Sequence, residues 1–131
     1  MTIAISNETK PENLTWLVGH LLHSYWGWWL SEERIREGVK NSLCFWVYDG
    51  ETPVAFARIV TDKAMFSSVV DLFVIEEYQG QGVGRKLMEA ILDHPDVKHT
   101  VCILATRDAA AFYCKFGFEL AVDPVLKKDP I

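Results

Sequence analysis

The feature that most constrains the fold is an uninterrupted succession of strand, glycine-rich loop and helix in the middle of the chain. Apolar, β-branched residues at 67–75 predict a strand. Three alternate glycines follow at 80, 82 and 84, and residues 82–94 then carry apolar side chains at helical spacing. Another strand is expected over 98–105. Strand, helix and strand in this order indicate a crossover connection within one sheet.

The remaining segments predict a hairpin and further helices around this unit. Two apolar runs flank Asp49-Gly50, a typical turn sequence, and predict a β-hairpin over 43–61. Other expected elements are a strand over 2–6, a helix from Pro11, a helix capped by Ser31, a short helix over 109–116 and a last strand over 118–122. We therefore expect one domain over residues 1–131 with a mixed α/β (α+β) fold: a central, mostly antiparallel sheet with helices on both faces.

The charge and cysteine content indicate which partners and compartment to expect. A net charge of −5 argues against broad contact with nucleic acid or anionic membranes, which require a basic face. Polar residues and glycines interrupt the most apolar stretch, 14–30, so no membrane span is predicted. The start of the chain does not resemble a secretory signal, and the three cysteines are dispersed. These features predict free thiols in a reducing compartment, the cytoplasm.

The glycine loop has the composition of an anion site. Glycines let backbone amides turn toward a ligand without side-chain clashes, and the loop opens directly into a helix N-terminus. Arg85 and Lys86 lie in the first helical turn, where cations are unfavourable unless a negative charge is nearby. A diphosphate would supply that charge. The alternative is a structural turn with two solvated cations, and neither the Rossmann nor the Walker pattern fits the residues.

Two motifs resemble the GNAT superfamily of N-acyltransferases. Residues 79–84, Gln-Gly-Gln-Gly-Val-Gly, match the Gln/Arg-x-x-Gly-x-Gly/Ala signature of that family. Residues 112–118, Phe-Tyr-Cys-Lys-Phe-Gly-Phe, resemble its later aromatic element, and the likeness extends over about 43–120. The resemblance implies a GNAT fold and transfer of an acetyl group from acetyl-CoA to a primary amine of a small molecule or peptide. It also implies direct attack in a ternary complex.

The same resemblance assigns the coenzyme contacts. Backbone amides of the loop would bind the pyrophosphate, with two side chains assisting, and the backbone of the preceding strand would hold the pantetheine arm and polarise the thioester. The loop amides are those of Gln81, Gly82, Val83 and Gly84. The assisting side chains are Gln79 and Arg85, and the strand residues are Phe73 and Val74.

Catalytic roles fall on two residues, each with a structural alternative. By resemblance Tyr113 donates a proton to the departing thiolate; alternatively it packs beside Phe112. Asp71 lies two residues before Phe73 on the same side of a strand, which makes it the candidate base. A carboxylate in an apolar strand could equally be the ion-pair partner of Arg58, which could itself bind an acceptor carboxylate.

An aromatic cluster between the first two helices is the candidate acceptor wall, with Trp26 as the chosen pocket residue. Core packing or a homodimer interface is the alternative for this cluster. His20 and His23 lack acidic or cysteine partners nearby in sequence, so no metal is expected. A non-catalytic acyl-CoA-binding regulatory module and an oligomerisation domain remain alternatives to an enzyme.

Overall fold

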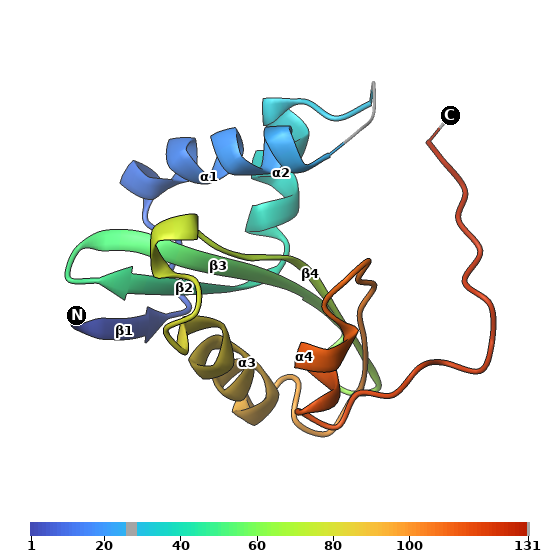
Figure 1. Ribbon diagram of the computed structural model, residues 1–131. Coiled ribbons are helices and arrows are strands. Elements are labelled where there is room, and N and C mark those ends of the chain that lie inside the picture. Colours follow the sequence, from blue (N-terminus) through green and yellow to red (C-terminus); the bar gives the residue numbers. More distant parts are fainter. Residues whose placement is uncertain (26–28, 131) are drawn as a thin grey trace.

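A five-stranded mixed sheet forms the centre of the computed structural model, which describes residues 1–25 and 29–130 (Figure 1). The strands are β1 (Ile3–Ser6), β2 (Leu43–Asp49), β3 (Thr52–Thr61), β4 (Phe66–Val74) and β5 (Val101–Ile103), and they lie in this order across the sheet. The first four pair antiparallel, and β4 pairs with β5 in parallel. The predicted mixed, mostly antiparallel sheet is confirmed.

Helices cover both faces of the sheet, as expected (Figure 1). Helices α1 (Pro11–Ser24) and α2 (Glu32–Lys40) lie on one face, and α3 (Val83–Asp93) and α4 (Ala110–Cys114) on the other. A 3₁₀ turn, η1 (Glu76–Tyr78), joins β4 to the glycine loop. Pro11 occupies the first turn of α1, and the Ser31 hydroxyl accepts a hydrogen bond from the Arg34 N–H at 3.2 Å. No described helix is both long enough and apolar enough to cross a membrane.

Alternation along β2 divides the core between the two faces. Phe45 and Val47 pack toward α3, whereas Trp46 and Tyr48 pack toward α1 and α2. Each half of the core thus holds one helical layer against the sheet.

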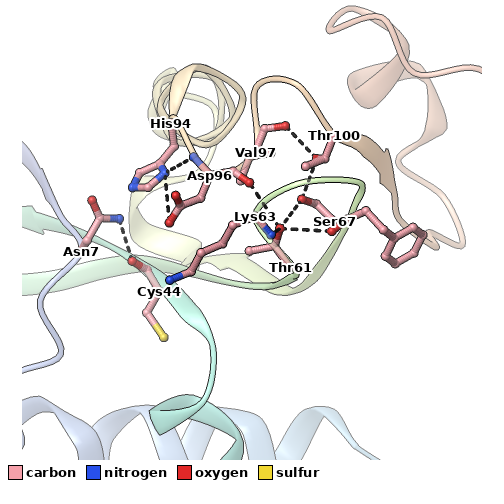
Figure 2. A network of polar contacts seen from close by, with 10 residues as sticks. Asn7, Cys44, Thr61, Lys63, Ser67, His94, Asp96, Val97 and Thr100 are labelled. Atoms are coloured by element: carbon pink, nitrogen blue, oxygen red, sulfur yellow. Dashed lines mark hydrogen bonds and ion pairs between the residues drawn. The ribbon is translucent and has the colours of Figure 1, made fainter.

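The pairing of β4 with β5 is short and confined to one end of β4. Only residues 66–68 of β4 pair with 101–103. A hydroxyl cluster reinforces this end: the buried Ser67 Oγ lies 2.8 Å from Thr61 Oγ1 and 2.7 Å from Thr100 Oγ1 (Figure 2). Beyond Ser68, β4 continues to Val74 with no strand beside it on this edge among the described residues. Its backbone groups there are available to another partner.

The C-terminal part of the chain departs from the sequence prediction. Residues 118–122 form no strand, so that prediction is wrong for the described chain, and β5 has three residues where 98–105 was expected. Alternation in 118–122 satisfies the local requirement for a strand, but no strand of the described sheet pairs with the segment.

Candidate functional site

The glycine loop turns its backbone in a way that only glycine adopts without strain. Gly80 and Gly82 have φ of +75° and +81°, in the left-handed region, and Gly82 is the N-cap of α3. The first hydrogen bond of the helix runs from the Lys86 N–H to the Gly82 carbonyl at 3.1 Å. Hence the N–H groups of residues 83–85 have no acceptor within the helix. These donors and the helix dipole make the loop suited to an anion.

Gly84 has a different reason to be glycine, namely close packing. A Cβ at this position would lie 3.4 Å from Phe112 Cζ and 3.8 Å from Val74 Cγ2. The missing side chain therefore lets α3, the end of β4 and α4 meet at one point. Through this contact the glycine loop, the unpaired strand edge and the helix that carries Tyr113 become neighbours.

Polar side chains hold the loop in shape. Gln79 Nε2 donates to the Val74 carbonyl at 2.9 Å, and Gln81 Nε2 donates to the Glu77 carbonyl at 3.0 Å. Arg85 pairs with Glu89 at 3.1 Å, but its side chain is 76% exposed. Such an exposed pair contributes little to stability, so Arg85 can turn toward a bound phosphate at small cost.

The strand register distinguishes the two β4 residues predicted to hold the pantetheine arm. The Ile75 N–H donates to the Val54 carbonyl at 3.0 Å and therefore faces β3. Since backbone groups alternate along a strand, the Val74 N–H faces the unpaired edge, whereas that of Phe73 faces β3. Of the two residues, Val74 has its backbone placed for a ligand in the gap between β4 and β5.

Tyr113 lies in α4 directly after Phe112 and is half-buried. Its ring makes edge contacts with Phe112 and Phe118 at centroid distances of 5.1 and 6.1 Å. Burial raises the pKa of its phenol, so the group keeps its proton at neutral pH. Both interpretations of this residue, proton donor and packing residue, are compatible with its environment.

Asp71 is the ion-pair partner of Arg58, which was the structural alternative to a catalytic base. Arg58 Nε lies 2.7 Å from Asp71 Oδ2, and the Tyr25 hydroxyl donates to Oδ1. Arg58 Nη1 also donates to Ser42 Oγ at 3.1 Å. The Asp71 side chain is only 5% exposed, and burial together with the Asp71 contact raises the pKa of Tyr25 to about 12. Both carboxylate oxygens are thus engaged.

A bulge explains why a charged side chain occurs within this apolar strand. The register of β3 with β4 shifts between Phe56 and Arg58, and Asp71 has a φ of +56°, rare for a residue other than glycine. The ion pair and the Tyr25 hydrogen bond hold Asp71 in this conformation.

An open groove of about 550 Å³ lies between α1 and the end of β4. Its lining residues are Trp16, His20, Ser24, Phe73, Val74, Ile75, Glu76 and Glu77. The His20 ring stacks on Phe73 at 4.8 Å and contacts Trp16 at 4.5 Å. The sequence predicted neither Trp16 nor His20 as a pocket residue, although their i, i+4 spacing places both on one face of α1.

Trp26, the chosen pocket residue, lies outside the described residues. Among residues 1–25 and 29–130, no group of three or more His, Cys, Asp or Glu side chains is arranged to hold a metal ion.

The fold and the site are those of an acyltransferase domain. Its mixed sheet has two parallel strands, β4 and β5, that pair at one end only, and the N-terminus of α3 lies beside the unpaired part of β4. The family model described as "Acetyltransferase (GNAT) domain" matches residues 40–120. The chain therefore belongs to the GNAT acetyltransferase family, which confirms the resemblance seen in its motifs.

Relatives and solved structures agree with this assignment. Serotonin N-acetyltransferase 2, chloroplastic, from rice (Oryza sativa subsp. japonica) is 33% identical over 100 residues, covering 71% of this chain and 49% of the relative. A GNAT-family protein structure from Xanthomonas campestris pv. campestris is 27% identical with a TM-score of 0.89, covering 99% of this chain and 94% of that one. The structure of a GNAT-family acetyltransferase from Streptococcus pneumoniae is 27% identical with a TM-score of 0.73, covering 98% of this chain and 98% of that one. The chain spans about half the length of the curated relatives it matches first.

Proposed function

We propose that the protein transfers the acetyl group of acetyl-CoA to a primary amine of a small molecule or peptide. The observation that carries this proposal is the meeting of the glycine loop with the unpaired edge of β4 at Gly84. In the proposed complex the diphosphate accepts hydrogen bonds from the loop amides of residues 81–84, and Arg85 turns toward it. Gln79 keeps the loop attached to β4.

The thioester carbonyl is proposed to accept a hydrogen bond from the Val74 N–H, which faces the gap. A fixed backbone dipole at this point stabilises the negative charge that develops on the carbonyl oxygen. Phe73 would contribute its ring rather than its backbone, since the ring lines the groove on the α1 side of the sheet. Acetyl group and acceptor would then meet at the end of β4.

We propose direct attack in a ternary complex. The acceptor attacks as a neutral amine: its nitrogen bonds to the thioester carbonyl carbon, and the C–S bond breaks. The leaving thiolate takes the proton of the Tyr113 hydroxyl, the nitrogen releases one proton to water as the amide forms, and the Tyr113 phenolate regains a proton from water. An acetyl-cysteine route is disfavoured because burial raises the pKa of both the Cys44 and the Cys102 thiols. These groups remain thiols at neutral pH, and a thiol is a weak nucleophile.

The acceptor is proposed to enter through the groove beside α1. Aromatic rings from Trp16, His20 and Phe73 line one part of it, and the exposed Glu76 and Glu77 lie at its edge. This combination suits a cationic amine with an apolar body, which packs on the rings while its charge remains near the carboxylates. Trp26 stays a predicted contributor to this wall.

Asp71 and Arg58 are bound to each other, so either residue could act on the substrate only by giving up part of that contact. To accept a proton, Asp71 would have to weaken its bond with Arg58 or with Tyr25. To bind an acceptor carboxylate, Arg58 would have to share its guanidinium between that group and Asp71. The geometry favours a structural role for the pair, and the base role of Asp71 remains a prediction.

The proposed compartment is the cytoplasm, and the proposed partner is the amine acceptor, with neither nucleic acid nor a membrane as a partner. All three cysteines are free, which fits a reducing compartment, and the net charge of −5 disfavours nucleic acid as a partner. The rice relative is named as chloroplastic, so localisation of the tagged protein in its own cells is the direct measurement of the compartment.

The decisive experiment measures CoA release from acetyl-CoA across a panel of amines, with Tyr113→Phe as the test variant. This substitution keeps the ring and its packing but removes the proton, so turnover should fall about 100-fold while CoA affinity changes little. Tyr48→Phe is the control, because Tyr48 is buried on the α1 and α2 side of β2. Tight CoA binding without turnover on any amine would instead support a non-catalytic binding module. Full activity in a folded Tyr113→Phe protein would remove the proposed acid.

A further inference from the structure

The chain beyond α4 leaves the domain as an extended apolar segment. After Gly117, whose φ is +92°, residues 118–130 form no helix or strand and run away from the sheet (Figure 1). Leu120 and Val122 are 90% and 99% exposed, and Val125 and Leu126 are 86% and 91% exposed. An isolated domain gains nothing from presenting four large apolar side chains to water.

The sequence of this segment has the pattern of a strand. Phe118, Leu120 and Val122 alternate with Glu119 and Asp123, so one face of an extended 118–123 is apolar and the other carries acids. Proline at 124 has no N–H to donate to a ladder and sets a natural end to such a strand.

The outer edge of β5 is a site where such a strand could pair. Strand β5 is the last in the sheet, and among the described residues nothing pairs with its outer edge. Val101 and Ile103 are 67% and 47% exposed. An uncovered, apolar strand edge is a ready template for pairing with another chain.

The tail does not cover the β5 edge of its own domain. Gly117 has a φ of +92°, and the half-buried Phe118 that follows it lies with its ring centroid 6.1 Å from that of Tyr113. The chain beyond this contact runs away from the sheet (Figure 1). We propose that residues 118–123 pair with the outer edge of β5 in a second copy of this chain, and that the exchange is reciprocal. The result is a strand-exchanged homodimer in which each sheet gains a sixth strand.

The area that the exchange would bury supports this occupant. Residues 118–123, about 700 Da, expose roughly 1,000 Å² when extended, by the scaling of unfolded-chain surface with mass. If half of that is buried in each of two tails, and a similar area on each partner, the interface exceeds the ~1,600 Å² typical of specific complexes.

The first test is the mass of the whole chain by sedimentation velocity over a range of concentrations. We expect a species of twice 14.9 kDa that dissociates on dilution. Val122→Asp puts a charge on the apolar face of the tail and should weaken association at least tenfold. Leu22→Asp is the matched control, because Leu22 is an exposed apolar residue on α1, and it should leave the dimer intact. A monomer at all concentrations, or a dimer unaffected by Val122→Asp, would overturn the proposal.

Hydrogen–deuterium exchange distinguishes strand exchange from other arrangements. In the dimer, amides of residues 118–123 and of β5 should be protected, and both protections should disappear on dilution to monomer and in Val122→Asp. Protection that persists in the monomer would show that the tail folds back on its own β5. A dimer with unprotected tail amides would show association through another surface. Either result contradicts the exchange.

Discussion

Replacing Gly82 by alanine separates the cost of the loop conformation from the loss of a ligand. Gly82 has a φ of +81°, and a Cβ built there meets no atom within 4 Å. The folded protein therefore has room for the methyl group, and the penalty is the left-handed backbone, about 1–2 kcal/mol. For a domain of this size that lowers Tm by roughly 4–8 °C.

Gly50→Ala supplies a control with the same backbone penalty. Gly50 has a φ of +63° in the turn between β2 and β3, and a Cβ there also meets nothing within 4 Å. Both variants should lose similar stability. Only Gly82→Ala should lose CoA affinity, at least tenfold, because its methyl group lies where the diphosphate must approach the α3 N-terminus.

Calorimetry and thermal unfolding with CoA give the readout. CoA at 100 times the wild-type Kd should stabilise the wild type and Gly50→Ala by about 2.7 kcal/mol, whereas Gly82→Ala, with a Kd at least tenfold higher, should gain at most about 1.4 kcal/mol at that concentration. Equal CoA affinity in the two folded variants would refute the assignment of the diphosphate to this loop. A loss of affinity in both would show that stability, and not the site, had been measured.

Three further outcomes follow from the ionisable and nucleophilic side chains. Replacing Cys44, Cys102 and Cys114 together by alanine should leave turnover largely intact, and a kinetically competent acetyl-cysteine detected by mass would contradict direct attack. Asp71→Asn should lower the unfolding free energy by about 2–4 kcal/mol, less than for a fully buried pair because the Arg58 side chain is 21% exposed; unchanged stability with lost turnover would favour the base role. The pKa of Tyr25 rises from 10.0 to about 12 on folding, so its contribution to stability is complete below pH 10 and is lost as pH rises toward 12. Urea unfolding across that range should show a decline that Tyr25→Phe reduces.

Local patterns predicted the elements well where one short segment contains the whole cause. Ser31 caps α2 because its own hydroxyl reaches the Arg34 N–H, and Asp49-Gly50 turns because Gly50 accepts a positive φ. The loop at 79–84 was likewise placed from its own residues. None of these features depends on what lies across the sheet.

Features that depend on residues far apart in the chain could not be predicted from the sequence. In the sequence Gly84 cannot be distinguished from the other loop glycines, yet its role depends on Phe112, which approaches from α4. The sequence offers His20 only as a metal ligand, because its contact with Phe73 exists only once α1 packs on β4. The strand predicted over 118–122 is wrong for the same reason: alternation is a local property, but a strand forms only where another strand pairs with it, and none in the described chain does.

A polar network of Arg58, Asp71 and Tyr25 joins β3, β4 and the end of α1. It gives Asp71 a role in shaping the site. Hydroxyl contacts of Ser67 hold the near end of β4 against β5, and pairing stops after Ser68. The bulge at Asp71 follows, and bulges bend a strand and increase its twist. A strand bent beyond its last paired residue diverges from its neighbour, which leaves the Val74 N–H facing an open edge. If the ion pair maintains that bend, Asp71 supports acetyl transfer through the shape of β4 without accepting a proton, and a carboxylate within an apolar strand is explained.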